Sequence, residues 1–233
     1  MTGSGTRPAA ALLSTTRLEA FSDGVFAIAI TLLVLDLVVP PHERPEGQTL
    51  AVALGAEWPA YFAYLVSFLV IGIIWINHHA MFALVRRVDR RVLFANLFLL
   101  LTVSVIPFPT RLLADYLTSE DDAHTAAAVY STTMFAMGLA FSLLFLAITR
   151  DARLLHAPLP PEAVRLARRK FGAGMVFYAA TIGLAFVSAV LTLAVHAALA
   201  VYYCFDQLAP TRPIAAGDGR PEEGNGRPTL GSD

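Results

Sequence analysis

A few polar side chains interrupt the apolar segments of this chain, and they are the residues whose types could do chemistry. The stretch 17–37, "RLEAFSDGVFAIAITLLVLDL", begins with Arg17, Ser22 and Asp23 and then becomes almost wholly aliphatic. Carboxylates and imidazoles can exchange protons or bind metal ions, whereas amides, hydroxyls and indoles mainly make hydrogen bonds. Further candidates lie in the segment "WINHH" and at one later asparagine; they are Trp75, Asn77, His78, His79 and Asn96.

The composition that surrounds these residues is that of a membrane protein. The chain has 233 residues, of which 56% are hydrophobic and 15% charged, and its mean hydropathy is +0.61. A helix needs roughly 20 mainly apolar residues to cross a hydrocarbon core of about 30 Å. Six segments meet this requirement, approximately 17–38, 57–81, 91–113, 124–149, 168–188 and 190–207. We therefore predict an all-α, polytopic membrane protein with six transmembrane helices per subunit.

Two local features of these segments predict where helices break. Pro107-Phe108-Pro109 falls late in the third segment and should kink or end its helix, because proline cannot donate a backbone hydrogen bond. The fifth and sixth segments leave room only for a tight turn, which we place around 188–191.

The distribution of basic residues predicts the orientation. Cytoplasmic loops of membrane proteins collect Lys and Arg, and 15 of the 17 basic residues fall on one side of the six segments. Both termini should therefore be cytoplasmic, and the cell membrane is the expected location. The loops on the other side are acidic, which would mildly concentrate cations there.

The rest of the chain excludes several classes of function. We divide it into a cytoplasmic N-terminal segment, 1–16, a transmembrane domain, 17–209, and a cytoplasmic tail, 210–233, which is rich in Gly, Pro and charge and is expected to be disordered. Cys204 is the only cysteine, so no intramolecular disulfide can form. A net charge of −1 gives no basic footprint for nucleic acid. No catalytic motif occurs, so we expect neither an enzyme nor a cofactor.

Counting residues from the helix ends places the polar residues at a similar depth in the membrane. The first segment leaves the cytoplasm at Arg17, and the second returns to it just before Arg86. We therefore predict a polar layer near the cytoplasmic ends, formed by Arg17, Ser22, Asp23, Trp75, Asn77, His78, His79 and Asn96. Hydrogen bonding between helices is the commoner role for such residues. Metal binding is not expected, since adjacent histidines point about 100° apart on a helix, but a pH response through His78 or His79 stays open.

A second pattern in the first segment is a stripe of aliphatic side chains. At about 100° per residue, Ile28, Leu32 and Leu35 share one face, with Thr31 at its edge, while Asp23 points elsewhere. Judged from these residues alone, the simpler explanation of the stripe is packing against a neighbouring helix.

The arrangement R-x-x-x-F-S-D that starts at Arg17, followed by "GVFAIAITLLVL", resembles the signature of the transmembrane protein 175 family of potassium channels, in its bacterial single-repeat branch. The similarity extends to "WINHH", Asn96 and "IPFPT", whereas the second half of the chain agrees mainly in helix number and hydropathy. The resemblance implies a homotetramer of six-helix subunits that assemble around a central pore in the lipid membrane, with the first helix lining this pore for potassium ions. It also implies that Ile28, Leu32 and Leu35, with Thr31 beside them, form the constriction, and that the polar layer anchors the helix.

Two other functions stay open beside a potassium-selective channel. The first is a proton-coupled carrier or a proton-permeable pore that uses Asp23 and His78. The second is a scaffold without a pore, whose Arg-rich loops bind lipid or a partner protein. No TVGYG-type sequence with its carbonyl rings occurs in the chain, so selectivity in a channel would need another origin.

Overall fold

The computed structural model describes residues 15–45 and 47–205, so most of the predicted N-terminal segment and the whole of the predicted tail lie outside the described residues. The regular elements in the described part are all helical, which confirms the all-α prediction. In chain order they are α1 (Thr16–Leu32), η1 (Leu33–Asp36), α2 (Leu50–Ala56), α3 (Trp58–Phe82), α4 (Arg90–Val105), α5 (Pro107–Tyr116), α6 (Ala123–Thr149), η2 (Ala152–Leu154), α7 (Pro161–Ala185) and α8 (Ala189–Phe205).

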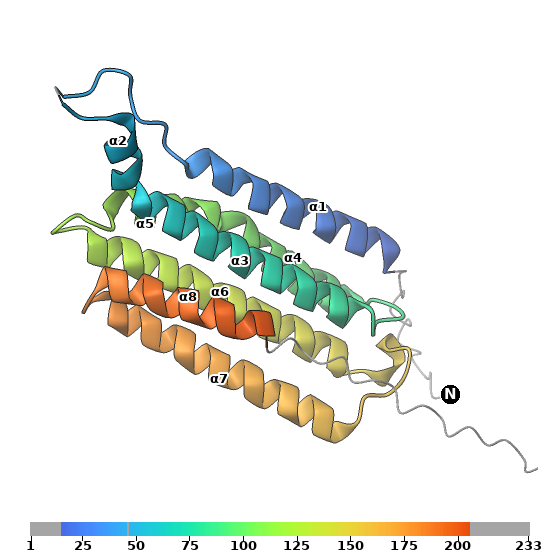
Figure 1. Ribbon diagram of the computed structural model, residues 1–233. Helices are drawn as coiled ribbons and strands as arrows, with labels where there is room; N and C mark the ends of the chain where they lie inside the picture. Colours follow the sequence, from blue (N-terminus) through green and yellow to red (C-terminus); the bar gives the residue numbers. More distant parts are fainter. Residues whose placement is uncertain (1–14, 46, 206–233) are drawn as a thin grey trace, which may run out of the picture.

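The long helices run side by side in one bundle (Figure 1). α6 packs against α4, α5, α7 and α8, whereas α1 lies at one edge of the bundle and packs mainly against α3 and α4. Four stretches are long and apolar enough to cross a membrane: α1 with η1, α3, α4 with α5, and α6. α8 is apolar but shorter, and α7 is long but begins with charged turns. Each of the six predicted segments thus corresponds to a helix or helix pair.

The helix that contains the fifth segment has other bounds than the apolar segment itself. α7 begins at Pro161, seven residues before the predicted start at 168, and ends at Ala185 instead of 188. Proline suits the first turn of a helix, and the Arg, Glu, Leu and Ala residues that follow favour helix. Hydropathy indicates where a segment becomes apolar, which is not where this helix begins.

The turn before α8 also lies earlier than 188–191. It comprises 186–188, and Ser188 caps α8, because its side chain accepts a hydrogen bond from the backbone N–H of Leu191 at 3.2 Å. A capping serine is a recognised start signal for a helix. A further helix, α2, lies in the predicted loop 39–56, where the Thr49 side chain accepts from Val52 N at 3.3 Å. Seven residues are too few to show a helical period in the sequence.

The predicted break in the third segment is confirmed. α4 ends at Val105 and α5 starts at Pro107. The Thr110 hydroxyl donates to the carbonyl of Ile106 at 2.8 Å. Its oxygen therefore accepts from Ser67 at 2.8 Å, and Ser67 in turn accepts from the hydroxyl of Tyr130 at 3.0 Å. This buried chain of hydroxyls joins α3, α5 and α6 at the break.

The α3–α4 and α6–α7 connections lie together at one end of the bundle and are joined through their backbones. Leu154 O accepts from the N–H groups of Arg86 at 2.8 Å and Arg87 at 3.2 Å, and His156 N donates to Leu84 O at 3.0 Å. We call these bonds the loop clasp. Because arginines gather here, we call this end of the bundle the basic end and the opposite one the acidic end.

Candidate functional site

The start of α1 is fastened to the bundle by its one buried polar side chain. The hydroxyl of Ser22 donates to Leu18 O, one turn back on α1, at 2.8 Å. Its oxygen is then an acceptor, and it receives a hydrogen bond from Nδ2 of Asn96 on α4 at 2.9 Å. Ser22 and Asn96 are fully buried. The bond therefore ties α1 to α4 where water cannot compete for either group.

The same asparagine extends the line to α3. Oδ1 of Asn96 lies 2.8 Å from Nε2 of His78. Since an amide oxygen can only accept, Nε2 carries the hydrogen; the amide orientation follows from the donation to Ser22. The His78 ring packs between Phe26, with centroids 5.3 Å apart, and Phe82, at 4.4 Å. We call Ser22, Asn96 and His78 the buried polar line.

A second contact between α1 and α3 lies on the surface of the subunit. Nε1 of Trp75 donates to a carboxylate oxygen of Asp23 at 2.9 Å, and both side chains are exposed. The indole also stacks on His79, with ring centroids 6.2 Å apart. A carboxylate facing lipid is costly unless a donor reaches it, and the indole N–H is such a donor.

The remaining residues of the predicted layer are not brought into these hydrogen bonds. Arg17 is exposed, and within the described ranges it makes no hydrogen bond or ion pair. Asn77 lies at the expected depth but about 200° around α3 from Trp75, at 100° per residue, and there it borders a cavity with Tyr203. His78 is buried while its neighbour His79 is exposed, as the divergence of adjacent helical side chains requires.

The aliphatic stripe lies on the opposite side of α1 from the bundle. Ile28, Leu32 and Leu35 are 61%, 42% and 71% exposed, so the described chain leaves a large part of each side chain uncovered. The backbone tightens to a 3₁₀ helix over η1. Because that helix turns by about 120° per residue, Leu35 comes directly into line with Leu32. Thr31 is also exposed, and its hydroxyl donates to its own helix at Ala27 O, 2.9 Å away.

Sequence reasoning missed a group of polar residues nearer the acidic end. Nε2 of His196 lies 3.1 Å from the hydroxyl of Ser131, and its ring stacks on Tyr178 at 5.9 Å and meets Tyr130 edge-on at 5.1 Å. These residues belong to three separate apolar helices, α6, α7 and α8, and they show no spacing in the sequence that could have linked them. Only the helix packing reveals the cluster.

The comparisons with known proteins decide the family. The family model described as "Endosomal/lysosomal potassium channel TMEM175" matches residues 17–107, which include the stripe and the buried polar line. A protein of Streptomyces collinus named as a potassium channel is 54% identical over 201 residues, covering 86% of this chain and 97% of its relative. This chain belongs to the TMEM175 family. Together with the apolar helices, membership makes this TMEM175 chain a multi-pass membrane protein.

Two further matches extend over the same region. A Chamaesiphon minutus protein named as a potassium channel is 41% identical over 189 residues, covering 81% of this TMEM175 chain and 93% of that protein. A crystal structure described as a lysosomal potassium-selective channel TMEM175 homologue from Chamaesiphon minutus matches the fold with a TM-score of 0.73 and 40% identity, over 82% of this chain and 96% of that one. Both comparisons therefore extend well beyond α1, α3 and α4.

Proposed function

We propose that this chain is the subunit of a potassium-selective cation channel, a homotetramer whose pore is lined by α1. The observation that carries the proposal is the exposed stripe of Ile28, Leu32 and Leu35 on a helix whose other face is held by the buried polar line. Such a stripe could simply face lipid. The potassium-channel names of relatives that are 54% and 41% identical favour a pore instead.

The position of α1 suits a central pore. In a closed ring of identical subunits, each subunit presents the same surface to the symmetry axis. α1 lies at the edge of its bundle, which leaves its stripe free to face that axis. With rises of about 1.5 Å per residue in α-helix and 2.0 Å in 3₁₀ helix, Ile28, Leu32 and Leu35 would form three rings about 6 Å apart.

Rings of this kind would control both gating and selectivity. Aliphatic constrictions close by dewetting, and they admit an ion only as it sheds part of its water shell. Potassium is more weakly hydrated than sodium and loses less, so selectivity would be modest. Thr31 lies beside the rings with its hydroxyl hydrogen donated to Ala27 O. The lone pairs of its oxygen would then be available to a cation that has lost water.

The buried polar line would keep this lining in place. Its bonds to α3 and α4 fix the rotation of α1, and the bond from Trp75 to Asp23 supports the same orientation. The basic end would face the cytoplasm, with both termini on that side and the cell membrane as the location, because arginine-rich loops stay on the cytoplasmic side.

Recordings from planar bilayers test the channel. Purified protein under a potassium/sodium gradient should give unitary openings and a reversal potential shifted toward that of potassium. Ile28→Ser and Leu35→Ser should enlarge the current and reduce that shift. Val34→Ser is the matched control, since Val34 is an exposed aliphatic residue of η1 that lies off the stripe. Unchanged currents in both stripe variants, or equal changes in the control, would contradict the stripe as the constriction.

The second candidate is a proton-coupled carrier or proton-permeable pore using Asp23 and His78. The partner of Asp23 is Trp75 and that of His78 is Asn96, so the two titratable groups are not hydrogen-bonded to each other. Asp23→Asn keeps an acceptor for Trp75 but removes the titratable group. A carrier would show saturable flux without unitary events and lose proton coupling in this variant, whereas a channel should retain its potassium current.

A further inference from the structure

A cavity of about 90 Å³ lies between α3, α6, α7 and α8, in the half of the bundle nearer the basic end. Its body is apolar and is lined mainly by Val70, Ile73, Met137, Phe141, Phe171 and Met175. Polar residues line it as well, namely Asn77, Ser142, Lys170 and Tyr203. The cavity is therefore amphipathic, with a lysine at its border.

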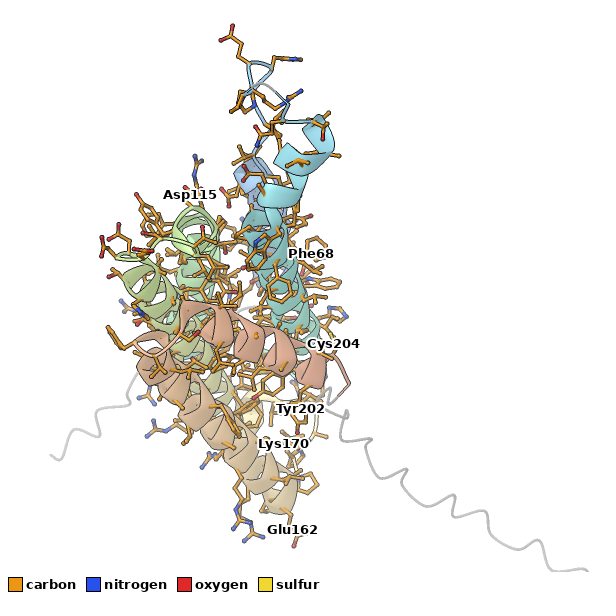
Figure 2. The ribbon with its side chains drawn as sticks, turned by 60° about the vertical axis from the view of Figure 1, so that its left-hand side comes forward. Phe68, Asp115, Glu162, Lys170, Tyr202 and Cys204 are labelled. Atoms are coloured by element: carbon orange, nitrogen blue, oxygen red, sulfur yellow. The ribbon has the colours of Figure 1, made fainter. Side chains whose placement is uncertain are left out.

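The position of Lys170 along the bundle places that border near the end of the apolar region. Lys170 lies fifteen residues before the acidic end of α7 at Ala185, or about 22 Å away at 1.5 Å per residue. Tyr203 lies fourteen residues from the start of α8 at Ala189, or about 21 Å along the returning helix. Figure 2 shows Lys170 beside the end of α8 that carries Tyr202, with Glu162 further along α7. Lysine and tyrosine are typical of the boundary between hydrocarbon and headgroups.

The charge around Lys170 is strongly positive. Arg165, Arg168 and Arg169 precede it on α7, and all four side chains are exposed. Glu162 is the one acidic residue between the start of α7 and Lys170, and it lies 3.8 Å from Arg165. An anionic headgroup at this level would meet several cations of α7, whose described turns before Lys170 contribute Glu162 as their one carboxylate.

A close contact between α7 and α8 shapes the polar border. The hydroxyl oxygen of Tyr203 lies 2.6 Å from the point where a Cβ on Gly174 would be. Only glycine leaves room for the phenol to cross α7 at this level, one turn from Lys170. The tyrosine ring is thereby held at the border of the cavity, where a bound molecule would meet it.

We propose that this cavity binds part of one acyl chain of an anionic glycerophospholipid, whose phosphate lies against Lys170. The cavity is smaller than the dry apolar cavity of about 150 Å³ that holds a benzene molecule in another protein, so it accepts a few methylene groups while the rest of the lipid stays in the bilayer. A phosphatidylcholine headgroup gains less binding free energy, because its own choline cation is repelled by the arginines. The site favours net-negative phospholipids of the membrane leaflet at the basic end.

Native mass spectrometry of the purified full-length chain tests the site with two probes of identical acyl chains, phosphatidylglycerol and phosphatidylcholine. A lysine near a membrane surface is worth about a fivefold preference for an anionic lipid, so the first bound phosphatidylglycerol should be about fivefold tighter. Lys170→Gln should reduce that preference to less than twofold. Arg168→Gln is the matched control: it removes the same charge two residues away but does not line the cavity, and should keep the preference.

A variant of the apolar body separates this site from general charge attraction. Ser142→Leu fills the cavity and should weaken the binding of both lipids. Lys170→Arg keeps the positive charge and should retain the preference for phosphatidylglycerol, so it controls for a folding defect in the Lys170→Gln variant. Equal binding of both lipids by the unaltered chain would overturn the proposal, as would equal effects of Lys170→Gln and Arg168→Gln. Displacement of phosphatidylglycerol by equimolar oleate would assign the cavity to fatty acids instead. The assay reads binding without current, so its result is independent of the channel function.

Discussion

Asn96 is the residue at which the packing of α1 can be tested most sharply. Replacing it with alanine removes the bond to Ser22 at 2.9 Å and the bond from His78 at 2.8 Å, so the buried Ser22 oxygen loses its donor and Nε2 of His78 loses its acceptor. Hydrogen bonds between membrane helices average about 0.6 kcal/mol and reach about 1.7, so losing two should cost about 1–3 kcal/mol. For a chain of this size, 1 kcal/mol shifts the melting temperature by about 2–4 °C. Asn96→Ala should therefore lower the melting temperature by about 2–12 °C.

Thermal unfolding of purified protein in detergent measures this shift. Asn77→Ala is the matched control, because Asn77 is a partly buried asparagine of the neighbouring helix that lies off the buried polar line. Combining Asn96→Ala with Ser22→Ala forms a double-mutant cycle, in which we expect a coupling free energy of about 0.6–1.7 kcal/mol. The reasoning is refuted if the control variant melts as early as Asn96→Ala, or if the two losses simply add.

Three further predictions concern the ends and crossings of helices. Gly174→Ala should lower the melting temperature, because its Cβ would meet the Tyr203 hydroxyl, and Tyr203→Phe in the same chain should restore most of the loss. Hydrogen bonds from Arg153 lower the pKa of Asp151 below its ordinary value. The stabilisation that these bonds give is present above the pKa that Asp151 has in the unfolded chain, and it is lost as pH falls through its pKa in the folded chain. Arg153→Gln should therefore destabilise the protein only above that pH range, and should raise the Asp151 pKa in an NMR titration. Asp89→Ala removes the cap of α4 and should cost about 0.5–2 kcal/mol in chemical unfolding, most of which Asp89→Ser recovers.

The features of the fold that sequence predicted are those set by local or one-dimensional rules. The length of each apolar segment is dictated by the bilayer, so every predicted segment has its helix. The break before Pro107 follows from a missing backbone donor in that residue itself. The start of α7 does not follow from hydropathy, because seven of its residues precede the apolar segment, and only Pro161 marks the beginning of the helix.

The same distinction applies to the site: the depth of a residue along the bundle could be predicted from the sequence, whereas the direction of its side chain could not. Depth can be counted from the helix ends, and it brought Asn96 and His78 to one level, where they are hydrogen-bonded. Direction depends on the rotation of each helix in the bundle, so Asn77 was grouped with residues it does not contact. The hydroxyls of Ser67 and Thr110 belong to helices that meet only through tertiary packing, and no pattern in the chain pairs them.

The loop clasp has a consequence for how the chain is made. Its two halves lie about 70 residues apart, at Leu84 and Leu154. At a synthesis rate of about 5–20 residues per second, the second half emerges roughly 4–14 seconds after the first. During that interval Arg86 and Arg87 have no partner for their backbone N–H groups within the bundle. The hairpin of α3 and α4 must therefore wait at the membrane until the fourth apolar segment has been inserted, and closing the clasp is a step that only a chain with the correct topology can complete.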